Sequence, residues 1–114
     1  MLGNENWVSL GFFPDQESVN WYRTREAGAR KYHPMSMVYR SVRKVAKMYP
    51  EADCYIQSGA GVFSVDIIEP LEKELRKPVI TSAAAQFFEI FYRMGTFEAI
   101  PGRGSLLASL EKGP

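Results

Sequence analysis

The chain has 114 residues, of which 46% are hydrophobic and 24% are charged; this is typical of one soluble globular domain and too short for two well-filled cores. Fourteen Lys and Arg residues against thirteen Asp and Glu residues give a formal net charge of +1, so no overall field favours nucleic acid or an anionic membrane as a partner. No apolar run approaches the roughly 20 residues that cross a bilayer, and the N-terminal Met-Leu-Gly-Asn-Glu-Asn lacks the features of a signal peptide. We therefore expect one cytoplasmic domain over residues 1–114, with no nucleic-acid and no membrane partner.

Metal-ligating residues are scarce. The single cysteine, Cys54, excludes an intramolecular disulfide, and together with the single histidine, His33, it falls short of the four ligands that a structural zinc site usually requires. The sequence predicts no structural metal.

The first half of the chain contains one predicted strand and one predicted helix. Residues 7–13, Trp-Val-Ser-Leu-Gly-Phe-Phe, combine β-branched and aromatic residues before a Pro-Asp turn, which favours a strand. Residues 15–32 have no clean period and fit a short helix or a long ordered loop equally well. Pro34 then begins a helix that ends at Pro50 and has one apolar face. Its basic residues lack neighbouring aromatics for base stacking, which favours a solvated surface over a nucleic-acid patch.

The second half alternates strands and helices. Residues 52–57 form a short apolar run between a proline and glycines, typical of a buried strand, and a helix with apolar residues at helical spacing follows until Lys77-Pro78. Residues 79–81 predict another buried strand, and Ala84, Phe87, Phe88 and Phe91 mark a helix that stops at Gly95. This order predicts an α/β fold, with a short parallel sheet flanked by helices.

Ligands of open parallel sheets bind beyond the carboxyl ends of the strands. The turn Ser58-Gly59-Ala60-Gly61 lies there, and its small residues let backbone N–H groups approach a ligand next to a helix N-terminus. Ser82, after the next strand, could add a hydroxyl. The alternative is that the glycines only form the turn and the hydroxyls only cap helices. The turn does not complete a dinucleotide-binding fingerprint, because Ser64 stands where the third glycine belongs.

Four segments together carry a resemblance to a known family. They are Ala52-Asp-Cys-Tyr-Ile-Gln-Ser-Gly-Ala-Gly, Asp66-Ile-Ile-Glu-Pro-Leu-Glu72, Lys77-Pro-Val-Ile-Thr-Ser82 and Gly102-Arg-Gly-Ser-Leu-Leu107. The set resembles the C-terminal half of the aspartate/glutamate racemase superfamily, in the branch of maleate isomerase and arylmalonate decarboxylase. The resemblance is best over residues 52–107. It implies one half of a two-domain fold whose active site lies between two similar halves, with the first half absent here.

The resemblance implies cofactor-independent racemase, isomerase or decarboxylase chemistry on a small carboxylic acid. Cysteine thiols in such enzymes move a proton at the carbon beside a carboxylate, and N–H and hydroxyl groups hold the carboxylate. The position of the family cysteine is Gly59 in this chain, so we expect no catalytic residue there and an impaired or absent activity. We expect Ser58, Gly59, Ala60, Gly61 and Ser82 to bind the substrate, with no cofactor and no metal.

Cys54 does not replace the missing thiol, because five strand residues put it roughly 16 Å from Gly59; we expect it to pack as a small buried side chain. Glu72 and Arg76, at i and i+4, predict an exposed ion pair. Tyr22, Tyr32 and His33 favour a surface loop over a contribution to the site.

The alternative function is a non-catalytic, truncated half that serves as an oligomerisation or partner-binding module. In that case Phe87, Phe88 and Phe91 form an apolar face that packs on a missing first half or on a second copy in a homo-oligomer.

Overall fold

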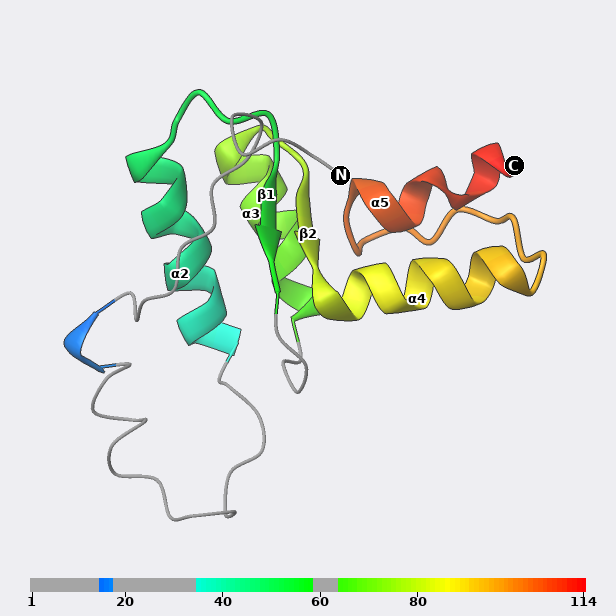
Figure 1. Ribbon diagram of the computed structural model, residues 1–114, viewed down its shortest axis with the longest axis horizontal. Coiled ribbons are helices and arrows are strands. Elements are labelled where there is room, and N and C mark those ends of the chain that lie inside the picture. Colours follow the sequence, from blue (N-terminus) through cyan, green and yellow to red (C-terminus); the bar gives the residue numbers. More distant parts are fainter. Residues whose placement is uncertain (1–14, 18–34, 59–63) are drawn as a thin grey trace, which may run out of the picture.

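A computed structural model describes residues 15–17, 35–58 and 64–114 (Figure 1). The predicted strand at 7–13 lies outside the described residues, as do Tyr22, Tyr32 and His33, and the turn residues Gly59, Ala60 and Gly61.

The described part confirms the predicted α/β fold. Its elements are α2 (Met35–Met48), β1 (Tyr55–Gln57), α3 (Val65–Leu75), β2 (Val79–Thr81), α4 (Ser82–Arg93), α5 (Ser105–Ala108) and the 3-10 helix η2 (Ser109–Lys112). β1 and β2 form a two-stranded parallel sheet, in which Tyr55 pairs with Val79 and Gln57 with Thr81. None of the described helices is long and apolar enough to cross a membrane.

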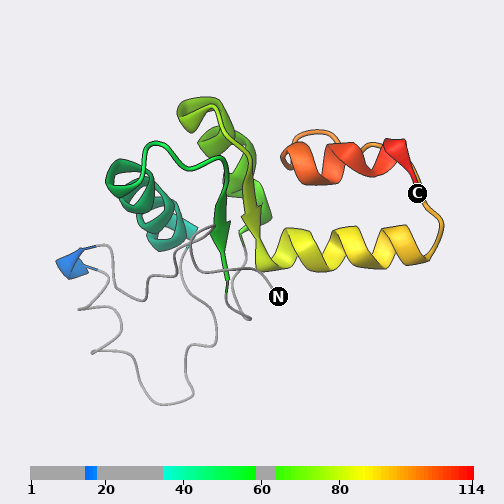
Figure 2. The ribbon, with the colours of Figure 1, turned by 45° about the horizontal axis from the view of Figure 1, so that its top comes forward.

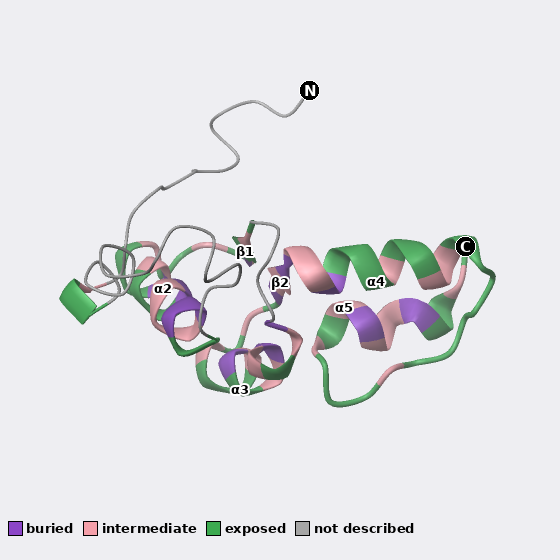
Figure 3. Ribbon diagram, turned by 90° about the horizontal axis from the view of Figure 1, so that it is seen from below, coloured by how far each residue is buried: buried purple, intermediate pink, exposed green. Residues whose placement is uncertain are grey.

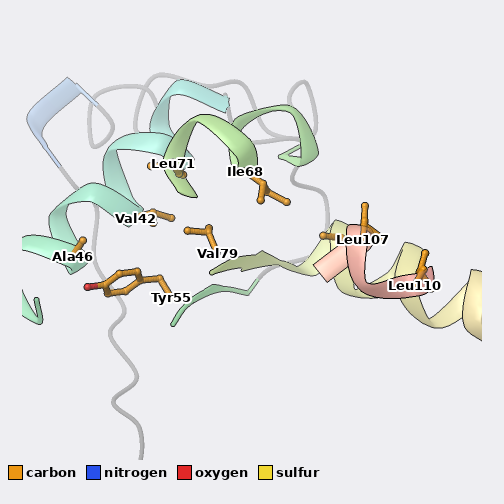
Figure 4. Packing of buried hydrophobic residues seen from close by; sticks show 9 residues of the cluster. Val42, Ala46, Tyr55, Ile68, Leu71, Val79, Leu107 and Leu110 are labelled. Atoms are coloured by element: carbon orange, nitrogen blue, oxygen red, sulfur yellow. The ribbon is translucent and has the colours of Figure 1, made fainter. Parts of the chain in front are cut away.

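The core lies between one face of the sheet and two helices. Figure 4 shows Val42 and Ala46 of α2 and Ile68 and Leu71 of α3 gathered around Tyr55 and Val79 of the strands. Successive side chains of a strand point to opposite faces of the sheet, so residues next to a buried one point away from the core. Ile56 is accordingly 73% exposed. The prediction of a buried strand at 52–57 is therefore wrong for Ile56, and the paired strand is shorter than predicted because β2 offers only three partners.

α4 leaves β2 without a loop and runs alongside α5 and η2, as Figures 1 and 2 show. The Thr81 hydroxyl accepts a hydrogen bond from the Ala84 N–H at 3.3 Å and so caps the helix. Leu107 and Leu110 of the C-terminal segment extend the core toward α4, where the half-buried Phe88 and Phe91 pack against it. Phe87 is instead 45% exposed. The prediction that all three phenylalanines share an open face is therefore wrong for Phe88 and Phe91.

Glu72 of α3 ties the C-terminal segment to the sheet. Its Oε2 accepts hydrogen bonds from the Val79 N–H at 2.9 Å and from the Ser105 hydroxyl at 2.8 Å, and its Oε1 accepts one from the Ser105 N–H at 2.8 Å. The predicted ion pair of Glu72 with Arg76 is wrong, because Arg76 ends α3 in the left-handed conformation, with φ at 58°. Its backbone there departs from the helical geometry on which i, i+4 neighbours depend.

Candidate functional site

The carboxyl ends of β1 and β2 lie side by side and bring two predicted binding residues to one rim of the sheet. Gln57 ends β1 opposite Thr81, and the exposed Ser58 follows it. Ser82 is the first residue of α4, and its hydroxyl donates a long 3.5 Å hydrogen bond to the Gln57 carbonyl. The structure thus places Ser58 and Ser82 at the same rim.

Ser64, which the sequence did not single out as a binding residue, stands directly before α3 and is completely buried. It occupies the N-cap position, yet its side chain makes no capping hydrogen bond, and among the described residues its Oγ has no hydrogen-bond partner. The Oε1 atom of Gln57, at the end of β1, is buried and unpartnered in the same sense. Buried polar atoms are normally hydrogen-bonded, since leaving one unpaired costs about 1–3 kcal/mol.

The N-terminus of α3 adds a positive partial charge to this rim, because its first backbone N–H groups have no partner within the helix. Asp66, in the first turn, would oppose an anion there. Its carboxylate, however, forms an ion pair with Arg103 at 3.2 Å, which offsets its charge. Hydroxyl and backbone N–H groups at this rim therefore match an acceptor-rich ligand such as a carboxylate.

Cys54 lies before β1, at the end of the strand opposite to Ser58, as the sequence predicted. It is half-buried rather than buried, because it precedes the paired part of the strand. Burial raises the pKa of the Cys54 thiol, and the nearby carboxylates of Glu72 and Asp53 raise it further. A thiol held in its protonated form is a poor nucleophile.

A shallow groove of about 340 Å³ lies elsewhere, between α3 and the segment that leads into α5. The carboxylates that line this groove already have partners within the chain. The Glu72 carboxylate binds the Val79 and Ser105 donors, and Glu69 pairs with Lys73 at 3.1 Å. No group of three His, Cys, Asp or Glu residues in the described ranges could hold a metal ion. The rim of the sheet is therefore the better candidate for ligand chemistry.

Comparison with known proteins gives two matches and one negative result. The family model of arylmalonate decarboxylase matches residues 30–107. A solved glycine-to-cysteine mutant of arylmalonate decarboxylase, in a sulfate-associated form, matches with a TM-score of 0.60 and 24% sequence identity. This match covers 66% of the chain and 33% of that structure, so the chain spans about a third of the solved protein's length. No curated protein matches the chain.

Proposed function

Because the chain belongs to the arylmalonate decarboxylase family, within the aspartate/glutamate racemase superfamily, we propose that it binds a small carboxylic acid at the rim formed by β1, β2 and α3. In this proposal the backbone N–H groups of Gly59, Ala60 and Gly61 and the hydroxyls of Ser58 and Ser82 hold the carboxylate. These are the positions that the family resemblance implied.

The unpartnered hydroxyl of Ser64 is the observation that carries the proposal. A fully buried donor without a partner is unfavourable in the unliganded protein. A carboxylate at the N-terminus of α3 would accept its hydrogen bond and also interact with the positive end of the helix. Ser64 therefore joins the proposed binding residues.

The proposed binding site has no thiol to perform the family's chemistry. By the family resemblance, Gly59 stands at the position of the family cysteine, and Cys54 lies at the other end of β1 with a raised pKa. The chain by itself thus lacks a thiolate beside the proposed carboxylate. We propose that the chain binds carboxylic acids of the family's substrate class without catalysing proton transfer or decarboxylation through a thiol.

Titration of the ¹⁵N-labelled chain with malonate, phenylmalonate and maleate tests the binding. We expect saturable shifts of the amide signals of residues 58–61, Val65 and Ser82 at millimolar ligand. Malonamide, which has the same carbon skeleton without a carboxylate, is the matched control ligand, and sulfate tests whether any oxyanion suffices. Equal shifts with malonamide, or none with the acids, would contradict the proposal.

The Ser64→Ala variant separates a binding role from a structural one. Loss of one hydrogen bond to a charged ligand should raise the Kd for malonate about tenfold, equivalent to about 1.4 kcal/mol. The melting temperature should not fall, because the hydroxyl has no partner to lose. Ser109→Ala removes a hydroxyl in η2 that donates to the Leu106 carbonyl and is the control. A lower melting temperature of Ser64→Ala with an unchanged Kd would assign the hydroxyl to stability instead.

A further inference from the structure

The side chain of Gln57 contains a hydrogen-bonding atom that the proposed carboxylate contacts leave unused. Its Nε2 donates a 2.9 Å hydrogen bond to the Ser58 carbonyl, which can only accept, and this contact sets the orientation of the amide. The other amide atom, Oε1, is buried, and no described residue donates to it. Because an amide oxygen can only accept, a ligand that satisfies Oε1 must bring a donor.

The pleat of β1 directs the Gln57 side chain toward α3. Tyr55 is buried between the sheet and the helices α2 and α3, and Gln57, two residues later, points to the same face. α3 connects the carboxyl end of β1 to the start of β2, so it begins with Ser64 at the end where Gln57 lies. Figure 3 views the molecule from this end and shows α3 beside the two strands. The rim thus presents a buried amide oxygen and the buried Ser64 hydroxyl, both without a partner in the described part of the chain.

We propose that the acid bound at this rim carries a hydroxyl group beside its carboxylate, and that Gln57 is the residue that selects this hydroxyl. The carboxylate accepts a hydrogen bond from Ser64, and the hydroxyl of the acid donates one to Gln57 Oε1. The preferred ligands are therefore 2-hydroxy acids, of which tartronate (2-hydroxymalonate) is the simplest derivative of malonate. This inference rests on the proposed function, because it assigns a second contact to the same bound acid.

The electrostatics of the rim favour a hydroxyl over an ammonium group as the donor. α2, α3 and α4 all begin at this end of the sheet, so the positive ends of their dipoles point toward it (Figure 1). The first turns of α2 and α4 contain no acidic residue, and Asp66 in the first turn of α3 is paired with Arg103 at 3.2 Å. These three first turns therefore offer a cation no unpaired carboxylate. A neutral hydroxyl forms the same hydrogen bond without placing a positive charge there.

An acid without a donor leaves Gln57 Oε1 without a partner in the complex. A site that hydrogen-bonds a ligand hydroxyl therefore discriminates against the analogue that lacks it. Because no described residue donates to Oε1 in the free chain, the ligand hydroxyl displaces none of them. One such hydrogen bond corresponds to about a tenfold lower Kd. We expect a preference of this size for 2-hydroxy acids over the same acids without the hydroxyl.

Calorimetric titration with a set of malonates that differ only in the group on C2 tests the proposal. Malonate, methylmalonate, tartronate and aminomalonate carry a hydrogen, a methyl, a hydroxyl and an ammonium group there. Tartronate should bind about tenfold more tightly than malonate, and the other two no more tightly than malonate. Equal Kd values for tartronate and methylmalonate, or tighter binding of aminomalonate than of tartronate, overturn the inference. Absence of binding by the whole set would contradict the proposed carboxylate site as well, so the two failures are distinguishable.

The Gln57→Met variant tests whether this side chain is the origin of the preference. Met has a similar length and only a weak acceptor, so the ratio of the malonate Kd to the tartronate Kd should fall from about ten to about one. Ser64→Ala is the matched variant, because it should weaken both acids alike and keep the ratio near ~10. An unchanged ratio in Gln57→Met overturns the proposal.

Thermal unfolding of the same two variants and of the double variant provides a second readout. The melting temperature of the double variant should differ from that of the unsubstituted chain by the sum of the two single effects, because neither atom has a partner among the described residues. A melting temperature that falls in each single variant and no further in the double would show that Gln57 and Ser64 bind each other, which overturns the proposal.

Discussion

At the scale of single residues, Glu72 shows why sequence neighbours do not settle a side chain's partners. Helical spacing predicted a pair with Arg76, whereas the carboxylate binds donors of Val79 and Ser105, 7 and 33 residues away. The chain turns back after α4, and this return brings Ser105 to α3. These bonds also explain why three of the family-like segments belong together, because one supplies the acceptor and the other two supply the donors.

Glu72→Gln should destabilise the fold by about 1–3 kcal/mol, since an amide supplies one acceptor where three donors converge. Urea unfolding measures the change. Glu69→Gln, one turn earlier on α3, is the control, because Glu69 makes an exposed ion pair with Lys73 that contributes less than about 1 kcal/mol. Equal losses for both variants would contradict the structural role of Glu72.

Cys54 gives a prediction for pH dependence. Burial, followed by the charges of Glu72 and Asp53, raises its pKa, so the folded protein retains the thiol proton above the ordinary midpoint of about 8.5. The iodoacetamide rate should reach its half-maximum at a higher pH in the folded chain than in urea. By linkage, this contribution to stability is complete below the unfolded pKa and is lost as pH rises through the folded one. Coincident pH profiles would contradict this.

The candidate site was predictable where it depends on topology. Parallel strands end at one rim, which is why Ser58 and Ser82 were expected together and lie together. Ser64 was not expected, although a serine immediately before a helical pattern is an N-cap signal. That signal predicts a serine hydroxyl that accepts a hydrogen bond from the first turn of α3. In the structure the Ser64 hydroxyl is instead buried and makes no such bond.

At the scale of elements, helices were better predicted than strands. Apolar spacing gave α2 and α3 nearly to their ends, because each has a clear buried stripe and a proline near its end. β1 is shorter than the apolar run at 52–57, since strand length depends on the partner. The 3-10 helix η2 was not expected, because four residues carry too little periodicity to show one.

Gly104 and Gly95 provide a matched pair for testing how the C-terminal segment docks. Both have positive φ, at 94° and 74°, but a Cβ at Gly104 would lie 2.3 Å from Ile68 Cγ2, whereas a Cβ at Gly95 meets nothing within 4 Å. Gly95→Ala should cost about 1–2 kcal/mol of backbone strain. Gly104→Ala should cost that amount and about 1–3 kcal/mol more from the clash, measured by urea unfolding. Equal costs would contradict close packing against α3.

At the scale of the whole molecule, the sequence predicted that the strands are parallel. It did not predict which elements cover each face of the sheet. Alternating strands and helices require crossovers, and short connections limit the choices. α5 and η2 lie beside α4 because the chain turns at Gly95 and again at Gly102. No local sequence pattern determines the direction of these two turns. Exposure of Ile56 and Phe87 likewise emerges only from the arrangement in space.

Shortening the chain tests whether the C-terminal segment completes the core. A chain that ends at Pro101 lacks Leu107 and Leu110, both nearly fully buried, and uncovers Phe88 and Phe91. We expect a broad thermal transition and binding of the dye ANS. A chain that ends at Lys112 keeps both leucines and should unfold cooperatively. A sharp transition of the shorter chain would show that the core closes without this segment.

Two hydrogen bonds where β1, β2 and α3 meet also bear on hydrogen exchange. The Tyr55 N–H donates to the Pro78 carbonyl, and the Val79 N–H donates to Glu72 on α3, so neither amide can exchange while this junction is intact. The strands pair directly, and α3 is the helix that lies between them in the chain, which makes separate opening of the sheet unfavourable. Amides of β1, β2 and the last turns of α3 should therefore exchange as one cooperative unit with similar opening free energies.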